Sequence, residues 1–141
     1  MVSKFHLLAR AIIVSNDQIL LVHAKGQNHS FLPGGHHEGN ESFPDTLRRE
    51  MKEELGVSVD IEEYLGAIEN SWVSENIENS EINHIFLVSS TTLDAKTPPE
   101  SKESHIEFFW AKPNELEKNN VLPKTLHPLI NQCLELKHSS Q

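Results

Sequence analysis

The sequence predicts a mixed α/β domain in which helices pack on a β-sheet. Short apolar runs rich in β-branched residues recur between turn-forming residues, as strands do. Two longer segments instead repeat their apolar residues with helical spacing. A chain of 141 residues suits one domain, and no repeat, low-complexity tract or linker divides it. We therefore expect a single domain over residues 1–141, with its strands flanked by helices.

Six segments are expected to form strands, and turn residues separate them. Ser15–Asp17 should join the first two strands as a hairpin, and Pro33–Gly35 should form a backbone-permissive loop after the third. We expect Trp72–Ser80 to be a polar loop between the fourth and fifth strands. The six predicted strands are Phe5–Val14, Gln18–His23, Phe31–Leu32, Val57–Ile68, Ile82–Ser90 and Ile106–Ala111.

Three segments have the features of helices. Ser42–Leu55 begins at a good N-cap residue and ends just before Gly56, a residue that often closes helices in the left-handed conformation. Pro113–Glu117 should open a short helix, because proline is tolerated in a first turn. Thr125–Lys137 should close the chain, with helically spaced apolar residues at Leu126, Leu129, Ile130, Cys133, Leu134 and Leu136.

The chain is acidic, with 12 basic and 21 acidic residues and a formal net charge of −9. Non-specific binding to duplex nucleic acid needs a basic surface, so the composition argues against duplex nucleic acid as a partner. An anionic substrate would need metal cations or a local basic patch to offset the repulsion.

The chain has one cysteine, Cys133, which excludes an intramolecular disulfide and fits a reducing compartment. We expect this cysteine to be a buried helix residue. No apolar run approaches the roughly 18 residues of a membrane span. Phe5–Val14 resembles the apolar core of a signal peptide, but Arg10 interrupts it and a second strand-like run follows at once. We therefore expect a cytoplasmic protein without a membrane segment.

The most informative segment is GHHEGNESFPDTLRREMKEELGV, residues 35–57. Glu54 falls inside the apolar stripe of its helix, with Glu50 beside it and Glu53 further round. Glu50 lies about one helical turn from both, near enough to share a ligand with either. At about 100° per residue, the apolar stripe consists of Phe43, Leu47, Met51 and Leu55.

Two interpretations compete for these carboxylates. A solvated acidic face, with Arg48 and Lys52 as ordinary surface charges, accounts poorly for Glu54, because a buried carboxylate is costly unless it is paired or metal-bound. A hard cation resolves this cost and the repulsion between like charges, since Mg²⁺ binds carboxylate oxygens, water and substrate phosphate. We therefore favour a metal site. We interpret His36 and His37 as loop histidines, because adjacent residues rarely point together and Mg²⁺ prefers oxygen.

The same segment resembles the Nudix box, G-x5-E-x7-R-E-U-x-E-E-x-G-U, in which U is apolar. Apolar strands precede it, as in the family, and a late strand carrying Trp110 is followed by Pro113 and Leu116. On these motifs the chain is identified as a member of the Nudix hydrolase family, of the MutT-like kind. Every box position matches: Gly35, Glu41, Arg49, Glu50, Met51, Glu53, Glu54, Gly56 and Val57.

The resemblance implies an α/β/α sandwich with a mixed β-sheet. It implies metal-dependent hydrolysis of the diphosphate linkage in a nucleoside diphosphate joined to another moiety. The residues that match the family's ligands to Mg²⁺, or to Mn²⁺ in its place, are Glu50, Glu53, Glu54 and the carbonyl of Gly34.

The resemblance also implies supporting and catalytic roles. Arg49 would orient a glutamate by ion pairing, and Glu41 would support that network beside Gly35. A general base must accept the proton of the attacking water. In the family this base is a helix glutamate, here Glu53 or Glu54, or a glutamate from a loop before the last strand. Here the loop candidate is Glu103, with Glu107 second; for both, an ordinary solvated glutamate is the favoured interpretation.

Four further residues are candidates for substrate binding. Arg10 and Lys25 are among the few basic residues expected near the box and could bind phosphate, although surface solvation is favoured. Trp72 could stack on a base, and packing at an edge is equally consistent. His84 alternates with apolar neighbours in a predicted strand, so it faces one side and is a weaker candidate for the substrate cleft.

The expected partner is a small nucleotide-like molecule, such as an ADP-ribose-like compound or a modified nucleoside triphosphate. The alternative is a non-catalytic Nudix module that senses a nucleotide, but such modules usually have eroded box glutamates and this box is intact. RNA cap removal is disfavoured by the acidic balance and the lack of a basic extension. Many relatives pair as dimers, so a homodimer is a further expectation.

Overall fold

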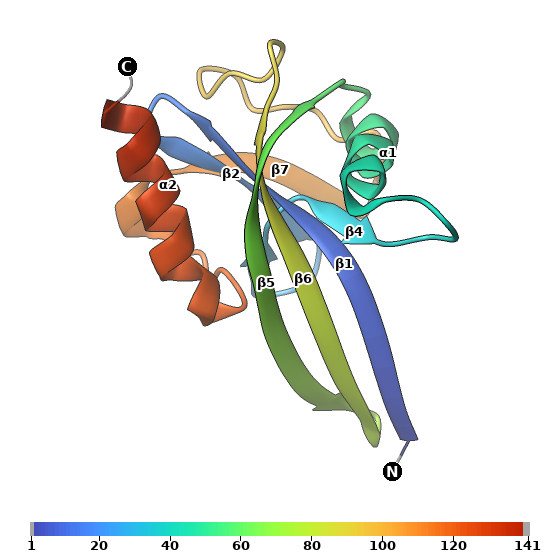
Figure 1. Ribbon diagram of the computed structural model, residues 1–141. Helices are drawn as coiled ribbons and strands as arrows, with labels where there is room; N and C mark the ends of the chain where they lie inside the picture. Colours follow the sequence, from blue (N-terminus) through green and yellow to red (C-terminus); the bar gives the residue numbers. More distant parts are fainter. Residues whose placement is uncertain (1, 140–141) are drawn as a thin grey trace.

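The computed structural model describes residues 2–139 and contains a mixed sheet with a helix on each face (Figure 1). The helices are α1 (Phe43–Leu55) and α2 (His127–Ser139), and two 3₁₀ turns are η1 (Pro113–Glu115) and η2 (Lys124–Leu126). The seven strands are β1 (Val2–Ser15), β2 (Gln18–Ala24), β3 (Ser30–Phe31), β4 (Gly34–His36), β5 (Asp60–Ser74), β6 (Ile77–Ser89) and β7 (Ile106–Ala111).

β1 lies at the centre of the sheet. The strand order is β3-β2-β1-β6-β5, with β4 paired to β1 and β7 paired to β2. β1 runs parallel to β6, and every other pair of strands is antiparallel. The α/β class and the mixed sheet expected from the sequence are confirmed. The pairing of β4 with β1 brings the glycine-rich loop against the middle of the central strand.

The two helices bury apolar side chains against opposite faces of the sheet. Leu47 and Met51 of α1 are fully buried against one face, together with strand residues such as Ile13 and Phe86. Leu126 of η2 and Ile130 of α2 are buried in a second cluster that contains Ile12, Leu21 and Ile85. Alternate residues of each strand therefore serve the two cores, which gives the α/β/α layering.

The start and stop signals of α1 act as predicted. The Ser42 hydroxyl accepts a hydrogen bond from the Asp45 backbone N–H at 3.2 Å, as an N-cap does. Gly56 adopts the left-handed conformation with φ 70°, and its N–H donates to the Lys52 carbonyl at 2.9 Å. These two caps fix the register of the box helix.

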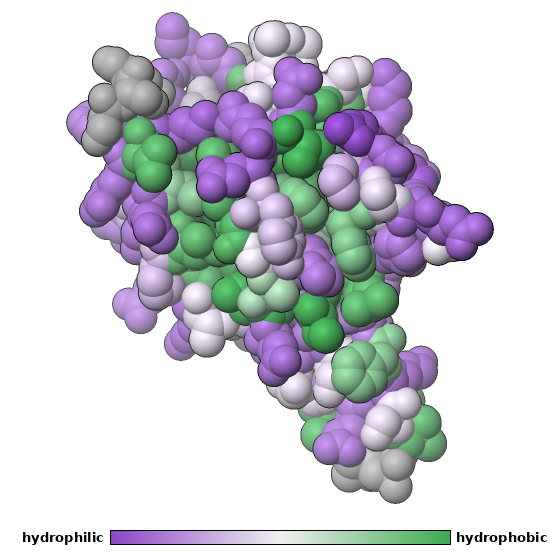
Figure 2. All heavy atoms as spheres, in the orientation of Figure 1, coloured by the Kyte–Doolittle hydropathy of each residue, from purple (hydrophilic) through white to green (hydrophobic). Residues whose placement is uncertain are grey.

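The predicted polar loop at Trp72–Ser80 is wrong. β5 continues to Ser74 and β6 begins at Ile77, so only Glu75 and Asn76 form the turn, with φ 51° and 62°. These polar residues form strands because the first part of β1 supplies a partner for β6. Residues 2–7, 69–74 and 77–82 thus form a three-stranded extension, the arm, which projects from the body in Figure 1. Apolar residues are exposed near its tip in Figure 2, among them Val2, Phe5 and Val73.

The remaining elements differ little from expectation. Asn16 and Asp17 form the predicted hairpin turn with φ 47° and 59°. The short helix predicted from Pro113 is a 3₁₀ turn, and the last helix begins at His127 rather than Thr125. A proline at position 128 suits the first turn of an α-helix, where no backbone N–H is needed. No helix in the described residues is long and apolar enough to cross a membrane.

Candidate active site

Two glycines bring the loop of β4 against both β1 and α1. Gly34 has φ 139°, and a Cβ there would lie 2.0 Å from the Ala9 carbonyl oxygen. A Cβ on Gly35 would lie 2.5 Å from the carboxyl carbon of Glu50. Glycine is therefore required at both positions for this packing, and the absent Cβ of Gly35 leaves the space that the Glu50 carboxylate occupies.

Arg49 lies at the centre of an ion-pair network at the start of the box. Its Nε and Nη2 atoms donate to the two carboxylate oxygens of Glu41 at 3.0 and 2.8 Å. Nη1 donates to Glu50 at 2.9 Å, and Nη2 donates to the His36 carbonyl at 2.9 Å. The Arg49 guanidinium, with hydrogen bonds from Thr46 and the Glu38 N–H, lowers the pKa of Glu41 to about 2. The paired arrangement predicted for Arg49 and Glu41 is present, and it orients Glu50.

Glu54 is the buried carboxyl predicted from the helical periodicity. Only 7% of its surface is exposed, between the core stripe of α1 and the loop before β7. Burial, the hydrogen-bonded carboxyl of Glu50 and the charge of Glu103 raise the pKa of Glu54 to about 9. At neutral pH and without a cation, the Glu50–Glu54 pair therefore retains a proton.

The donor set partly fits a divalent cation. Glu50 and Glu54 supply adjacent carboxyl oxygens, the ligands that Mg²⁺ prefers. Without a cation, the retained proton reduces the repulsion between the two carboxyl groups. Glu53 is half-exposed and lies 3.4 Å from Arg49. In the described part of the chain, no three His, Cys, Asp or Glu side chains converge so that they could hold a metal ion. A site with all three glutamates therefore needs Glu53 to rotate away from Arg49.

Arg10 and Trp72 line a cavity of about 580 Å³, and the charges of Glu50 and Glu54 act on this arginine. Nη1 of Arg10 donates to the Leu32 carbonyl at 3.1 Å, and its guanidinium lies 5.3 Å from the centre of the Phe31 ring. Burial lowers the pKa of Arg10, whereas the charges of Glu81, Glu54 and Glu50 oppose that change. Arg10 thus provides positive charge in the cavity wall and near the acidic helix, where an anionic group would need it. The lining residues are Arg10, His29, Phe31, Asn70, Ser71, Trp72, Glu81 and Leu122.

Comparisons with known proteins agree with this arrangement. The model of the NUDIX domain matches residues 5–133. The chain belongs to the Nudix family.

Two solved structures resemble this Nudix chain over most of its length. A NUDIX hydrolase from Nitrosomonas europaea is 25% identical, with a TM-score of 0.68, and the match covers 97% of this chain and 90% of that one. A NUDIX-family hydrolase from Clostridium perfringens is 25% identical, with a TM-score of 0.69 and coverages of 93% and 97%. Together with the family membership, these likenesses support hydrolase activity on pyrophosphate bonds.

A curated relative matches a shorter stretch. The low-salt glycan biosynthesis protein Agl8 of Haloferax volcanii is 38% identical over 65 residues, or 45% of this chain. The match spans 42% of the length of that protein. This similarity is regional and leaves the rest of both chains outside the comparison.

The two loop-base candidates of this Nudix chain lie in different surroundings. The charge of Glu103 acts on Glu54, so Glu103 is near the carboxyl pair. Its side chain is 36% exposed and lies 3.4 Å from His105. Glu107 instead pairs with His23 at 3.0 Å across β2 and β7, and it lines a separate hollow. This geometry favours Glu103 over Glu107 as the loop candidate.

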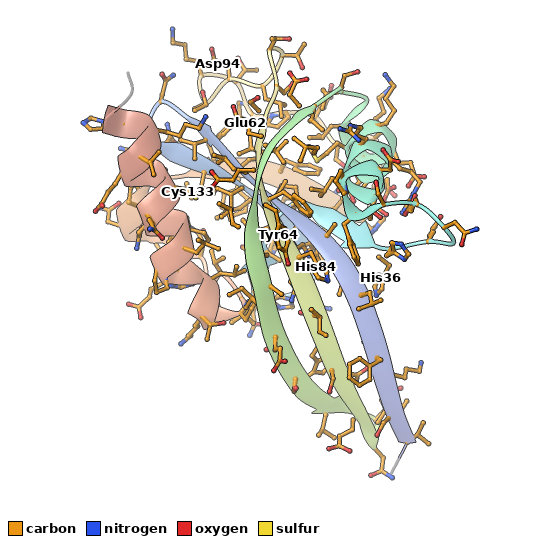
Figure 3. The ribbon with its side chains drawn as sticks, in the orientation of Figure 1. His36, Glu62, Tyr64, His84, Asp94 and Cys133 are labelled. Atoms are coloured by element: carbon orange, nitrogen blue, oxygen red, sulfur yellow. The ribbon has the colours of Figure 1, made fainter. Side chains whose placement is uncertain are left out.

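Lys25 and His84 do not line the cavity. Lys25 is exposed in the turn after β2, where its backbone N–H donates to the His105 carbonyl. His84 points to the α1 side of the sheet, where it packs on Phe43 and bonds the Tyr64 hydroxyl at 2.9 Å (Figure 3). Burial lowers the pKa of His84. His84 therefore lies on the other face of the sheet from Trp72, because Trp72 pairs with Asn79 and residues 79 and 84 of β6 point to opposite faces. A contact between His84 and the substrate stays a prediction.

His36 and His37 point apart, as expected for adjacent residues. His36 is not a loop residue as predicted, because Gly34–His36 pair with β1 as strand β4. His36 bonds His6 at 3.1 Å, whereas His37 bonds the Glu41 carbonyl at 2.6 Å. Cys133 is buried on α2, as predicted, and burial raises the pKa of its thiol. It lies on the opposite side of the sheet from the box helix (Figure 3).

The sequence analysis missed Glu81 and Asn70, which line the cavity from β6 and β5. Residues 79, 81 and 83 share one face of β6, but Glu78 and Ser80 on the other face are polar as well. No alternation of polar and apolar residues therefore marks this part of the strand, and the predicted strand begins only at Ile82.

Proposed function

We propose that this Nudix protein hydrolyses a pyrophosphate bond in a small nucleotide-like molecule, using Mg²⁺ or Mn²⁺. The observation that carries the proposal is the hydrogen-bonded Glu50–Glu54 pair, in which Glu54 is buried, Glu50 lies against Gly35, and both charges act on Arg10 of the cavity wall. Two carboxyls that share a proton in a buried position favour exchange of that proton for a cation. Glu53 would complete the ligand set after releasing Arg49, with the Gly34 carbonyl as a further candidate.

The side chains around the pair have distinct tasks in this proposal. Arg49, held by Glu41, fixes the orientation of Glu50. Arg10 binds a phosphate group that extends from the cavity toward the helix. Bound cations would neutralise the phosphate oxygens and acidify the attacking water. Glu103, or a glutamate of the helix, accepts the proton of that water.

The test is turnover of a panel of nucleoside diphosphate derivatives and nucleoside triphosphates with Mg²⁺ or Mn²⁺, read as phosphate released after phosphatase coupling. Glu54→Gln should lower kcat by about 100-fold or more, because it removes a cation ligand. Glutamine resembles the protonated carboxyl, so the variant should still fold. Glu69→Gln, an equal charge change at an exposed position of β5, should leave turnover unchanged.

The results distinguish an enzyme from a nucleotide sensor. Turnover on some panel member, lost in Glu54→Gln, supports the enzyme. Nucleotide binding without turnover on any member would favour a sensing module. Near-normal turnover in Glu54→Gln would contradict the assignment of the carboxyl pair as the cation site.

A further inference from the structure

The cavity lined by Arg10 contains an acidic residue that the proposed hydrolysis does not use. Glu81 projects from β6 into this cavity of about 580 Å³, a volume within the range of small-molecule sites. An acidic side chain in a cavity intended for an anionic nucleotide is unfavourable unless it binds a specific part of the ligand. The groups around Glu81 therefore indicate which chemical groups of a ligand it would bind.

Glu81 is held from one side by two amides. Its Oε1 atom accepts hydrogen bonds from the Asn83 amide at 3.1 Å and the Asn70 amide at 3.4 Å. Asn83 is only 2% exposed and also donates to the Ile68 carbonyl, so it is a fixed donor. Within the described residues, Oε2 has no hydrogen-bond partner, and it remains a charged acceptor for a ligand.

Asn70 adds a second acceptor next to Oε2. Asn70 and Glu81 are directly paired across β5 and β6, and both line the cavity. The Asn70 amide nitrogen is directed at Glu81, which leaves its carbonyl oxygen available to a ligand. Two neighbouring acceptors select a ligand edge with two neighbouring donors, because an unmatched buried acceptor is costly.

The same cavity has aromatic walls that suit a flat ring. Trp72 follows Asn70 by two residues and so lies on the same face of β5. The imidazole of His6 stacks on it with centroids 5.8 Å apart and an interplanar angle of 19°, which fixes the indole. Trp72 is still 40% exposed, and Phe31 lines the same cavity. Stacking on aromatic rings favours a base over a sugar for the group that meets the two acceptors.

We propose that Glu81 is a specificity-determining residue that, with Asn70, accepts hydrogen bonds from the ring N–H and adjacent amino group of a guanine-type base. The inference rests on the proposed function and names its substrate class, a guanine nucleotide derivative. The charges of Glu81, Glu54 and Glu50 all act on Arg10, so one guanidinium lies near both the acceptor pair and the carboxyl pair that would hold the cation.

The experiment compares binding of guanosine diphosphate (GDP) and inosine diphosphate (IDP) to the full chain by titration calorimetry. IDP keeps the ring N–H but lacks the amino group. We expect the wild type to bind GDP about tenfold or more tightly than IDP, as the loss of a charged hydrogen bond implies. Deoxy-GDP, which lacks one ribose hydroxyl, should bind as GDP does.

Glu81→Gln should reduce the GDP preference to about twofold or less. The donors of Asn70 and Asn83 would hold the glutamine oxygen, so its NH₂ group would face the cavity and oppose the donors of guanine. Glu78→Gln, the same change on an exposed position of the same strand, should keep the wild-type preference.

Two results would overturn the inference: equal affinities for GDP and IDP in the wild type, or a GDP preference unchanged by Glu81→Gln. A dependence of Glu81 on the ribose hydroxyl instead of the amino group would also overturn it, in favour of a sugar contact. Because binding is measured without turnover, failure of the proposed hydrolysis leaves this test intact.

Discussion

At the scale of single residues, Gly35 determines where the Glu50 carboxylate can lie. The carboxyl carbon lies only 2.5 Å from where a Cβ on residue 35 would be, and a hydrogen bond from Arg49 holds the carboxylate there. The position of Glu50, a predicted cation ligand, therefore depends both on the lack of a side chain at Gly35 and on the ion pair with Arg49.

Gly35→Ala should displace Glu50, because the new Cβ would lie 2.5 Å from its carboxyl carbon. We expect kcat to fall by about 10-fold or more and Mg²⁺ affinity to weaken, since ligand geometry is lost. Gly39→Ala is the control, because Gly39 lies in the same loop with φ 52° and open space around it. Steady-state kinetics and Mg²⁺ titration of both variants test this expectation. Equal losses of kcat and Mg²⁺ affinity in the two variants would show that loop strain, rather than the clash with Glu50, is responsible.

The residues of the box could be predicted from the sequence because their roles depend on local spacing. Glu50 and Glu54 share one helix, so periodicity alone placed Glu54 on its buried face. Lys25 is exposed in its turn, in line with the solvated interpretation that its sequence position favoured. The face of the sheet on which His84 lies depends on strand register, which local spacing does not reveal. Glu81 was missed for the same reason.

At the scale of elements, the arm shows how a weak sequence signal becomes a strand. Residues 69–71 and 78–81 are all polar, so neither alternation nor hydrophobicity marks these parts of β5 and β6. Pairing with β1 supplies the stability that the sequence pattern lacks. By contrast α1, with a cap at each end and an apolar stripe between, was predicted nearly to the residue.

The sequence of the arm's turn, Glu75-Asn76, is not the one that best stabilises its conformation. Glu75 and Asn76 both have positive φ, which suits Asn-Gly better than Glu-Asn in a two-residue hairpin. The double variant Glu75→Asn, Asn76→Gly should raise stability by about 0.5–1 kcal/mol and Tm by about 2–5 °C. Thermal unfolding followed by circular dichroism measures the change. A lower Tm would show that the turn does not adopt this conformation.

At the scale of the whole molecule, the buried acid couples stability to pH. The pKa of Glu54 rises from 4.5 to about 9 in the folded chain. Between these values the unfolded chain has lost this proton while the folded chain retains it, so the free energy of unfolding falls as pH rises. The pKa of Glu41 is lowered from 4.5 to about 2 in the folded chain. Its ionised form therefore stabilises the fold fully above about pH 4.5, and this stabilisation is lost as the pH falls toward 2.

With a chelator present, the wild type should therefore lose more stability between pH 5.5 and 8.5 than Glu54→Gln does. Urea unfolding at the two pH values measures both chains, and added Mg²⁺ should restore wild-type stability at the higher pH. Identical pH slopes for the two chains would mean that Glu54 ionises normally in the folded state.

His6 links distant parts of the fold, because its ring contacts His36 beside the glycine loop, Trp72 on the arm and the buried Asn79. His6 is not among the residues that line the cavity, but it connects Trp72 of the cavity wall to His36 at the end of β4. The position of Trp72, and with it the width of the cavity, then depends on the contacts of His6 as well as on the lining residues. A larger base would have to displace Trp72 against these contacts. Substitutions at residues outside the cavity lining, such as His6, would therefore change which bases fit.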